Sequence, residues 1–181
     1  MQLPNNFILK KDDIVLSIID ENDQVALESI SQDSRIWAHN PHFNDPKQFP
    51  DEWFKKALQQ KEKGTRIPFV IRYKNQVIGS TSFYDMDDHK VTIGYTWLHP
   101  DYWGRGINGV IKQMLLHYLF TCEKLGEVNF VIDILNLRSR AAVEKLGAIQ
   151  TDTIYNHIQR PDGSWRASIV YSITPHSPEA I

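Results

Sequence analysis

A glycine-containing loop followed by a long amphipathic helix is the feature that most constrains the fold of this chain. The loop covers residues 102–109 and reads Tyr-Trp-Gly-Arg-Gly-Ile-Asn-Gly. After it, apolar residues recur at the three- and four-residue spacing of a helix with one buried face. This predicted face consists of Ile107, Val110, Ile111, Met114, Leu115, Tyr118, Leu119 and Cys122. A short strand before the loop completes the segment Trp97–Cys122.

The start of this helix is expected to bind an anion, and pyrophosphate in particular. The first main-chain N–H groups of a helix have no intrahelical acceptor, and the helix dipole adds about half a positive charge there. Gly104, Gly106 and Gly109 have no Cβ to keep an anion away, and the first turn carries no acid. Arg105 adds a forked cation that suits phosphate oxygens. A tight turn without a ligand is the alternative.

The same glycines also spell G-x-G-x-x-G, the fingerprint of dinucleotide-binding proteins. That motif requires a strand that runs directly into its first glycine, near the start of an alternating series of strands and helices. Here residues 99–103 separate the strand from Gly104, and strands joined by short turns precede them. An NAD(P)-binding protein is therefore the weaker alternative.

Length and composition limit the class of protein. A chain of 181 residues fits one domain, which we place at residues 1–181 with its core at about residues 12–175. The chain has 41% hydrophobic and 23% charged residues, which is typical of a folded protein. Its net charge of −2, without long basic runs, argues against a nucleic-acid partner. We recognise no membrane span and no signal peptide, so a cytoplasmic location is expected.

The cysteine and histidine content predicts neither a disulfide nor a metal site. The single cysteine, Cys122, excludes an intrachain disulfide and fits a reducing compartment. Its place on the apolar helix face predicts a packed thiol rather than a nucleophile. His39 and His42 could form a metal pair, but no clustered acids or cysteines accompany them.

Periodicity and turn residues predict a mixed α/β (α+β) fold. We expect strands at residues 14–19, 67–73, 77–84, 91–98, 128–135, 148–157 and 164–173. The expected helices cover residues 20–33, 51–63, 107–122 and 137–146, with Asp20 or Asn22, Asp51 and Asn136 as caps. Only the crossover through the long helix joins parallel neighbours. The sheet is therefore mostly antiparallel, with about seven strands and about four helices.

Two segments resemble motifs of the GCN5-related N-acetyltransferases (GNAT), and the RimJ/RimL-like branch most closely. Residues 96–108, Thr-Trp-Leu-His-Pro-Asp-Tyr-Trp-Gly-Arg-Gly-Ile-Asn, look like the acetyl-CoA motif. Residues 136–148, Asn-Leu-Arg-Ser-Arg-Ala-Ala-Val-Glu-Lys-Leu-Gly-Ala, resemble the second motif. The expected element order agrees over nearly the whole chain. The resemblance implies a GNAT-like fold, acetyl-CoA as cofactor and transfer of an acetyl group to an amine.

The loop and the catalytic positions depart from the usual GNAT pattern. In the loop, Trp103 replaces the usual Gln or Arg, as it does in the RimJ/RimL-like branch. Val143 stands where many relatives have the tyrosine that protonates the leaving thiolate, and Ser139 is the alternative group of the branch. Thr92 lies where relatives often have a glutamate base. The general base therefore stays open, with Asp133 and His157 as candidates for a relay through water.

The resemblance also implies roles for individual residues. The strands on either side of the long helix would splay apart beyond a bulge, leaving main-chain groups for the pantetheine arm. A main-chain N–H near Leu98 would stabilise the oxyanion, and Asn136 would hold the acyl or pantetheine arm. Ser139 would donate to the departing sulfur, unless it only caps its helix. The predicted cofactor-binding set is Trp97, Leu98, His99, Trp103, Gly104, Arg105, Gly106, Ile107, Asn108, Gly109, Asn136, Ser139 and Arg140.

The sequence constrains the amine acceptor less than it constrains the cofactor. An attacking amine must be neutral, and the pKa of an α-amine is about 7.7–8.0 against about 10.4 for lysine. Without an obvious base, the site suits a peptide N-terminus, an amino acid or another amine of low pKa, and an aminoglycoside stays open. The acidic turn at 85–88 would attract a cation or is merely solvated. Candidates for the acceptor pocket are Trp37, Trp53, Tyr84 and His157, although buried tryptophans are more often core residues.

Two further questions stay open at the level of the sequence. A non-catalytic acyl-CoA sensor would use the same loop without transferring the acetyl group. The protein is expected to be a monomer or a homodimer.

Overall fold

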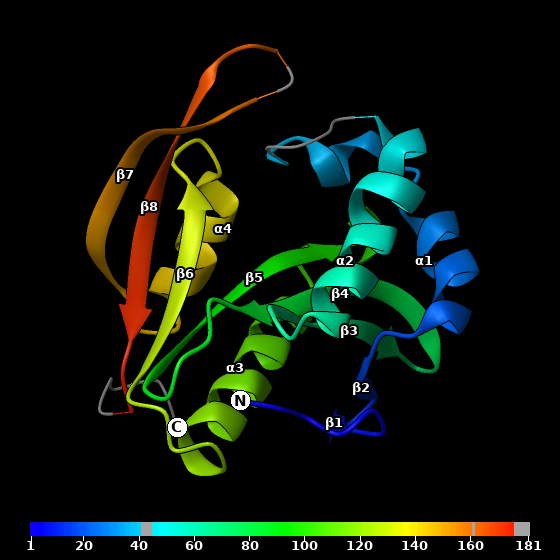
Figure 1. The fold of residues 1–181 in the computed structure, drawn as a ribbon, viewed down its shortest axis with the longest axis horizontal. Helices are drawn as coiled ribbons and strands as arrows, with labels where there is room; N and C mark the ends of the chain where they lie inside the picture. Colours follow the sequence, from blue (N-terminus) through cyan, green and yellow to red (C-terminus); the bar gives the residue numbers. More distant parts are fainter. Residues whose placement is uncertain (41–44, 161, 176–181) are drawn as a thin grey trace.

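The computed structural model describes residues 1–40, 45–160 and 162–175, which form one sheet covered by helices (Figure 1). The sheet has eight strands in the order β1-β2-β3-β4-β5-β6-β8-β7. Only β5 and β6 pair in parallel, and the other neighbours are antiparallel. The strands are β1 (Ile8–Lys11), β2 (Ile14–Ile18), β3 (Arg66–Tyr73), β4 (Gln76–Tyr84), β5 (Lys90–Leu98), β6 (Glu127–Asp133), β7 (Ile149–Gln159) and β8 (Trp165–Ile173).

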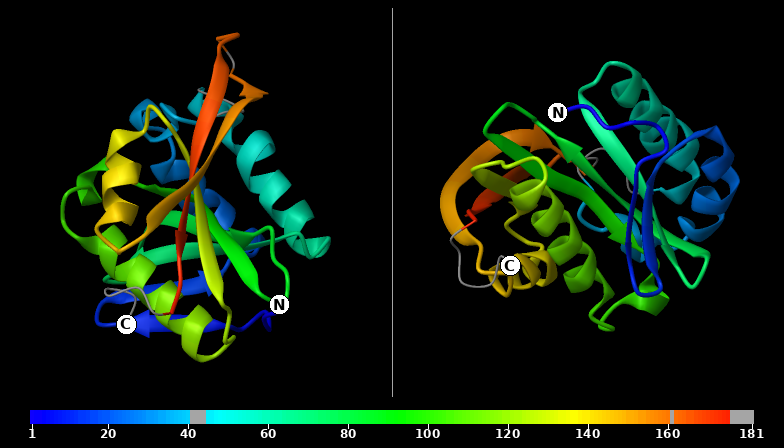
Figure 2. Two further views of the ribbon diagram at one scale, coloured as in Figure 1. Left: turned by 90° about the vertical axis from the view of Figure 1, so that its left-hand side faces the viewer. Right: turned by 90° about the horizontal axis from the view of Figure 1, so that it is seen from below.

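The α-helices of the described residues cover both faces of the sheet. Helix α3 lies on the opposite side of the sheet from α1 and α2 (Figure 2). Phe69 and Val70, which are consecutive on β3, therefore point into different cores, as the alternation of a strand requires. The helices are α1 (Gln24–Ile30), α2 (Lys56–Glu62), α3 (Ile107–Thr121) and α4 (Leu137–Glu144).

The two faces carry two hydrophobic cores of different composition. The larger core packs α3 and α4 against the sheet and is mainly aliphatic. The smaller core lies under α1 and α2, and we call its ring-bearing residues, Trp37, Phe49, Trp53, Phe54 and Trp97, the aromatic cluster. The ring centroids of Trp37 and Trp97 lie 5.3 Å apart, and those of Trp53 and Trp97 lie 5.7 Å apart.

The structure confirms the predicted mixed fold and corrects several details. It adds β1, whose residues are mostly exposed and therefore lack the apolar alternation of a half-buried strand. Asp51 does not cap a helix, because it lies inside a widened helical segment, Phe49–Lys55, that runs into α2. Cys122 is exposed rather than packed, because α3 ends at Thr121 and the face no longer continues.

Two further expectations concern the N-terminal helix and residues outside the description. Asp20 caps a short 3-10 turn, Glu21–Asp23, that leads into α1. His42, one half of the considered metal pair, lies outside the described residues, as does the tail after residue 175. No helix in the described part of the chain is long and apolar enough to cross a membrane.

Candidate active site

The site begins where β5 and β6 part. Their pairing is limited to residues 90–92 of β5 and 127–129 of β6. Farther along, β5 contains a bulge, because its partners shift from Ser82 opposite Gly94 to Ser80 opposite Trp97. Tyr95 lies in this bulge with a φ of 51°. An extra residue bends its strand away from the ladder, so the bulge accompanies the predicted opening between β5 and β6.

Leu98 presents its main chain to this opening. The N–H of the next residue, His99, donates a 2.8 Å hydrogen bond to the Ile78 carbonyl on β4. Successive residues of a strand direct their main-chain groups to opposite sides, so the N–H and C=O of Leu98 face the β6 side. The His99 N–H is therefore engaged within the sheet. The predicted bond from this N–H to the pantetheine arm would have to replace the bond to Ile78.

The approach of β4 to this end of β5 depends on a glycine. A Cβ on Gly79 would lie 2.1 Å from the Trp97 carbonyl oxygen, far inside van der Waals contact. The Trp97 carbonyl therefore faces β4 and not the opening. Of the three residues predicted to bind pantetheine, Leu98 is the one whose main chain is directed to the open side.

The glycine loop lies at the front of α3 and has the properties of an anion cradle. In residues 1–40, 45–160 and 162–175, the main-chain N–H groups of residues 104–109 have no protein acceptor. Gly104 and Gly106 have φ values of +71° and +76°, which favour glycine. A Cβ on Gly104, Gly106 or Gly109 would meet nothing within 4 Å, so these glycines face open space. The buried Oδ1 of Asn108 also lacks a partner among the described residues.

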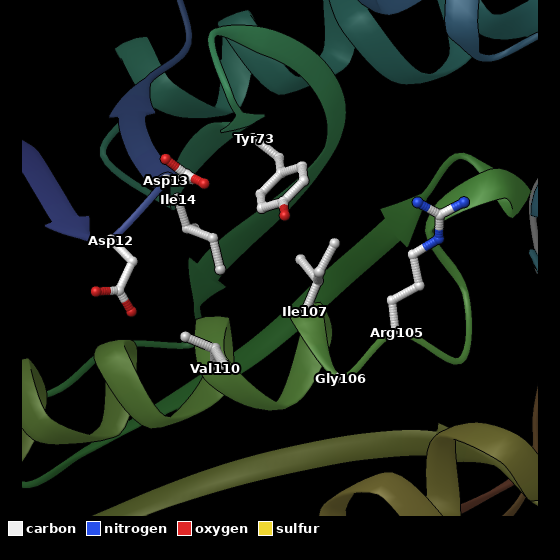
Figure 3. Close-up of a pocket in the computed structure, with 8 residues that line it drawn as sticks. All are labelled: Asp12, Asp13, Ile14, Tyr73, Arg105, Gly106, Ile107 and Val110. Carbon is white, nitrogen blue, oxygen red and sulfur yellow. The ribbon is translucent and has the colours of Figure 1, made fainter.

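A hollow of about 290 Å³ lies beside this cradle, between α3 and the turn that joins β1 to β2 (Figure 3). Arg105, Gly106 and Ile107 line one wall, and Asp12 and Asp13 lie on the other. Carboxylates repel a phosphate, so this wall does not suit the pyrophosphate. The loop itself, with its unpaired N–H groups, is the better place for the anion.

The start of α4 closes the other side of the opening. The Asn136 Oδ1 accepts a 3.1 Å hydrogen bond from the Ser139 N–H and so caps the helix, as predicted. Within the described chain, the Ser139 Oγ makes no hydrogen bond. The capping role considered for Ser139 therefore belongs to Asn136, and the Ser139 hydroxyl is available for another partner.

Two arginines of α4 lie near the site, and only one of them, Arg140, was predicted to contact the cofactor. The Arg140 guanidinium donates to the Tyr171 hydroxyl and to the Ile134 carbonyl, each at 3.1 Å. These bonds favour a role in holding α4 to β8 over the predicted contact with the cofactor. Arg138, which was not predicted, lies with its Cζ 3.6 Å from the centre of the Trp103 ring. Its position in the second motif was the only available signal.

The predicted acceptor residues have different surroundings. Trp37 and Trp53 are 2% and 4% exposed and belong to the aromatic cluster, so the alternative that they are core residues is favoured. Tyr84 lies on the sheet with its ring 5.0 Å from that of Tyr95, and burial raises the pKa of its hydroxyl. The exposed His157 lies on β7, where its Nε2 is 3.5 Å from the Ser168 Oγ on β8.

The candidates for the general base are constrained by their contacts. Thr92 is buried in the sheet between its partners on β4 and β6. Both oxygens of Asp133 accept hydrogen bonds, one from the Leu135 N–H at 2.9 Å and one from Arg160 at 2.7 Å. Asp133 is thus an ion-pair partner of Arg160, an arrangement that disfavours a proton relay.

A buried lysine near the opening was not anticipated. Lys112 projects from α3 under the sheet, where its Nζ donates to the Thr96 Oγ1 at 2.7 Å and lies 5.6 Å from the Phe130 ring. Its amine therefore lies between β5 and β6. Burial lowers the pKa of this amine to about 7. The sequence did not predict the burial of Lys112, because the buried face of α3 was assigned from its apolar residues alone.

The fold and the loop have counterparts in a known family. Residues 13–149 match the family model described as an acetyltransferase (GNAT) domain. The chain belongs to the GNAT family. It is therefore an N-acetyltransferase, and acetyl-CoA is the cofactor of its family. The cradle at residues 104–109 fits the pyrophosphate of this cofactor, because its donors lack protein acceptors.

Solved acetyltransferase structures share the fold. RimJ from Mycobacterium smegmatis in complex with CoA-disulfide superimposes with a TM-score of 0.75 and 20% identity, over 90% of this chain and 82% of that one. The RimL ribosomal-protein acetyltransferase gives 0.81 and 16%, over 93% and 94%. A spermidine N-acetyltransferase from Vibrio cholerae in complex with CoA and spermine gives 0.74 and 14%, over 91% and 97%. No curated protein matches the chain.

Metal-binding residues do not gather anywhere in the described chain. Among residues 1–40, 45–160 and 162–175, no group of three or more His, Cys, Asp or Glu side chains could hold a metal ion.

Proposed function

We propose that this GNAT protein transfers the acetyl group of acetyl-CoA directly to a primary amine while both are bound. The observation that carries the proposal is that two sets of main-chain groups are available to a ligand. The N–H groups of residues 104–109 lack protein acceptors, and the Leu98 main chain faces the gap between β5 and β6. Together they offer a site for a diphosphate joined to an extended amide-containing arm.

Each part of the site would then have its own role in binding or catalysis. The loop 104–109 would hold the diphosphate, with Arg105 as an additional cation. The Leu98 N–H would stabilise negative charge that develops on the acetyl carbonyl oxygen. The Asn136 amide would orient the arm, and the Ser139 hydroxyl would donate a proton to the departing sulfur, directly or through water. Acetyl-CoA, when bound, supplies the activated thioester.

An amine of low pKa is the preferred acceptor. No described side chain at the opening combines a free carboxylate with access to an incoming amine, since Thr92 is buried and Asp133 is paired. An α-amine is partly neutral near pH 7.4, whereas a lysine is neutral to about one part in a thousand. Relatives of the same fold include ribosomal-protein acetyltransferases and a spermidine acetyltransferase, so both peptide N-termini and polyamines belong in the test.

A screen for release of the CoA thiol tests the proposal. Acetyl-CoA is supplied with amino acids, polyamines, aminoglycosides and peptides that differ in their first residues, and each amine is also run without enzyme. Enzyme-dependent release with at least one amine supports transfer. Tight binding of acetyl-CoA without release for every amine would instead favour the acyl-CoA sensor. Calorimetry with CoA and NAD(P) tests the remaining alternative, an NAD(P)-binding protein. Such a protein would bind NAD(P) and not CoA.

A further inference from the structure

An arginine beside the end of β6 has most of its hydrogen-bonding capacity unused within the described chain. The Arg166 side chain on β8 is only 11% exposed. Its Nε donates to the Ser168 Oγ at 2.8 Å, but in the described parts of the chain Nη1 and Nη2 have no acceptor. Its Nε also lies 3.9 Å from the Asp133 Oδ2. The two terminal nitrogens are not among the buried atoms without a partner, so they reach the surface of the molecule and can donate to a group from outside the protein.

The carboxylate that lies near Arg166, that of Asp133, is already neutralised. Arg160 approaches the same Asp133 oxygen more closely, at 2.7 Å, and also donates to the Trp165 carbonyl. Arg160 and Arg166 carry two positive charges, and Asp133 carries one negative charge. The three side chains together therefore have a net positive charge, which we assign to Arg166. The β7–β8 hairpin that carries Arg160 and Arg166 extends past the end of β6 (Figure 1).

A second cation, Arg66, has no carboxylate partner among the described residues and lies beside Tyr95. Arg66 on β3 is 3% exposed, and its Cζ lies 3.8 Å from the Tyr95 ring and 4.9 Å from the Trp53 ring. Its Nε donates to the Ser82 Oγ at 2.8 Å, while its buried Nη2 has no partner among the described residues. Burial lowers the pKa of Arg66 to about 10, which leaves it charged at neutral pH.

Tyr84 and Tyr95 lie near both cations. Both rings are close enough to Arg66 and to Arg166 to interact with them electrostatically. Tyr95 is in the bulge of β5, directly beside the gap, and is 38% exposed. Both arginines therefore lie within electrostatic range of the bulge of β5.

We propose that Arg166, assisted by the positive charge of Arg66, binds a carboxylate of the acceptor, so that the substrate is an amine that also carries a carboxylate. A planar guanidinium with two free terminal nitrogens matches a carboxylate through two parallel hydrogen bonds. The carboxylate is either the α-carboxylate of a free amino acid or an acidic side chain near a peptide N-terminus. This inference rests on the proposed acetyl transfer and makes polyamines poor acceptors.

The test compares acceptors with and without the carboxylate, and every kcat/KM is expressed per concentration of neutral amine, because a nearby carboxylate also raises the pKa of the α-amine. One arm pairs each free amino acid with its α-carboxamide, and the other pairs peptides carrying Asp or Glu in their first two residues with the Asn or Gln versions. We expect the wild type to show a kcat/KM at least tenfold higher for the carboxylate member in one arm, which identifies the source. Arg166→Gln should reduce this preference to threefold or less, mainly through a higher KM for the carboxylate member. The preference of Arg166→Lys should lie between those of the wild type and Arg166→Gln. Lysine keeps the positive charge but cannot make the two parallel hydrogen bonds of a guanidinium.

The wild-type preference decides the inference even if the variants do not fold. Equal rates within every pair, or higher rates with carboxamides or polyamines, would overturn the carboxylate site while leaving acetyl transfer supported. If no amine releases CoA, the proposed transfer fails, and the subsite is then tested by calorimetry with N-acetyl amino acids and N-acetyl peptides in the presence of CoA. Tenfold tighter binding of the carboxylate than of the matched carboxamide supports the site, and equal binding overturns it.

Discussion

The Trp103 indole donates a 2.8 Å hydrogen bond to the main-chain carbonyl of Leu98, and this bond ties the glycine loop to the end of β5. On the same ring, the Arg138 guanidinium of α4 lies 3.6 Å from the ring centre. A single side chain thus connects the strand, the loop and the helix that surround the proposed cofactor site. The contact also holds the Leu98 carbonyl on the side of the sheet where β5 has lost its partner.

Replacing Trp103 by phenylalanine should weaken binding of acetyl-CoA. The change removes the donor to Leu98 and keeps an aromatic ring for Arg138. A hydrogen bond of this kind contributes about 0.5–1.5 kcal/mol, so the Kd measured by calorimetry should rise about threefold to tenfold. Trp165→Phe is the control, because Trp165 is 56% exposed on the hairpin. An unchanged Kd in Trp103→Phe would show that the loop does not depend on this bond.

A glutamate in the cradle should abolish cofactor binding without unfolding the protein. Gly106→Glu adds negative charge beside the unpaired N–H groups and places a side chain at a φ of +76°. We expect the Kd for CoA to rise at least tenfold. Gly64→Glu is a matched control, since Gly64 has a φ of +68° and equally open surroundings, away from the site. Both variants should lose about 1 kcal/mol of stability from the backbone conformation. Equal CoA affinity in the two variants would contradict the assignment of the cradle.

Removing the Ser139 hydroxyl should slow transfer and leave binding intact. The Oγ has no hydrogen bond within the described chain, and Asn136 caps the helix through the Ser139 main chain. Ser139→Ala should therefore keep the fold and the Kd for CoA, while kcat falls about a hundredfold or more from loss of a proton donor. Rates are measured with an acceptor found in the thiol-release screen. Wild-type turnover in this variant would refute the role of Ser139 as acid.

The buried Lys112 should make stability depend on pH. Its neighbours are Thr81 on β4, Thr96 on β5 and Phe130 on β6, and burial alone lowers its pKa from 10.5 to about 7. Between these values the unfolded chain binds a proton that the folded chain does not, so the free energy of unfolding contributed by Lys112 rises with pH. The slope is at most about 1.4 kcal/mol per pH unit. Below about pH 7 this contribution is at its minimum.

Urea unfolding of the wild type and Lys112→Met at several pH values between 6 and 10 measures this effect. The difference between the two proteins removes the contribution of other titrating groups. We expect the wild type to gain stability relative to the variant as the pH rises from 7 to 10. Parallel pH profiles would show that the amine remains protonated in the folded protein.

The sequence by itself determined the features that depend on neighbouring residues. Asn136 caps α4 as predicted, because a capping bond spans only three residues. Gly104 and Gly106 adopt the conformations that favour glycine, and the hairpin of β3 and β4 forms around its short turn. The pattern of these elements was sufficient for the mixed sheet, with its single parallel pair at β5 and β6.

Only the tertiary structure decided which polar groups are buried and which partners they have. The periodicity of α3 did not reveal that Lys112 lies in the core, nor that the thiol of Cys122 is exposed beyond the end of the helix. Arg66 and Arg166 are one hundred positions apart in the chain and interact electrostatically with the same two tyrosines. Helix caps and turns are formed by residues a few positions apart, whereas burial and charge pairing depend on strands brought together by the whole sheet.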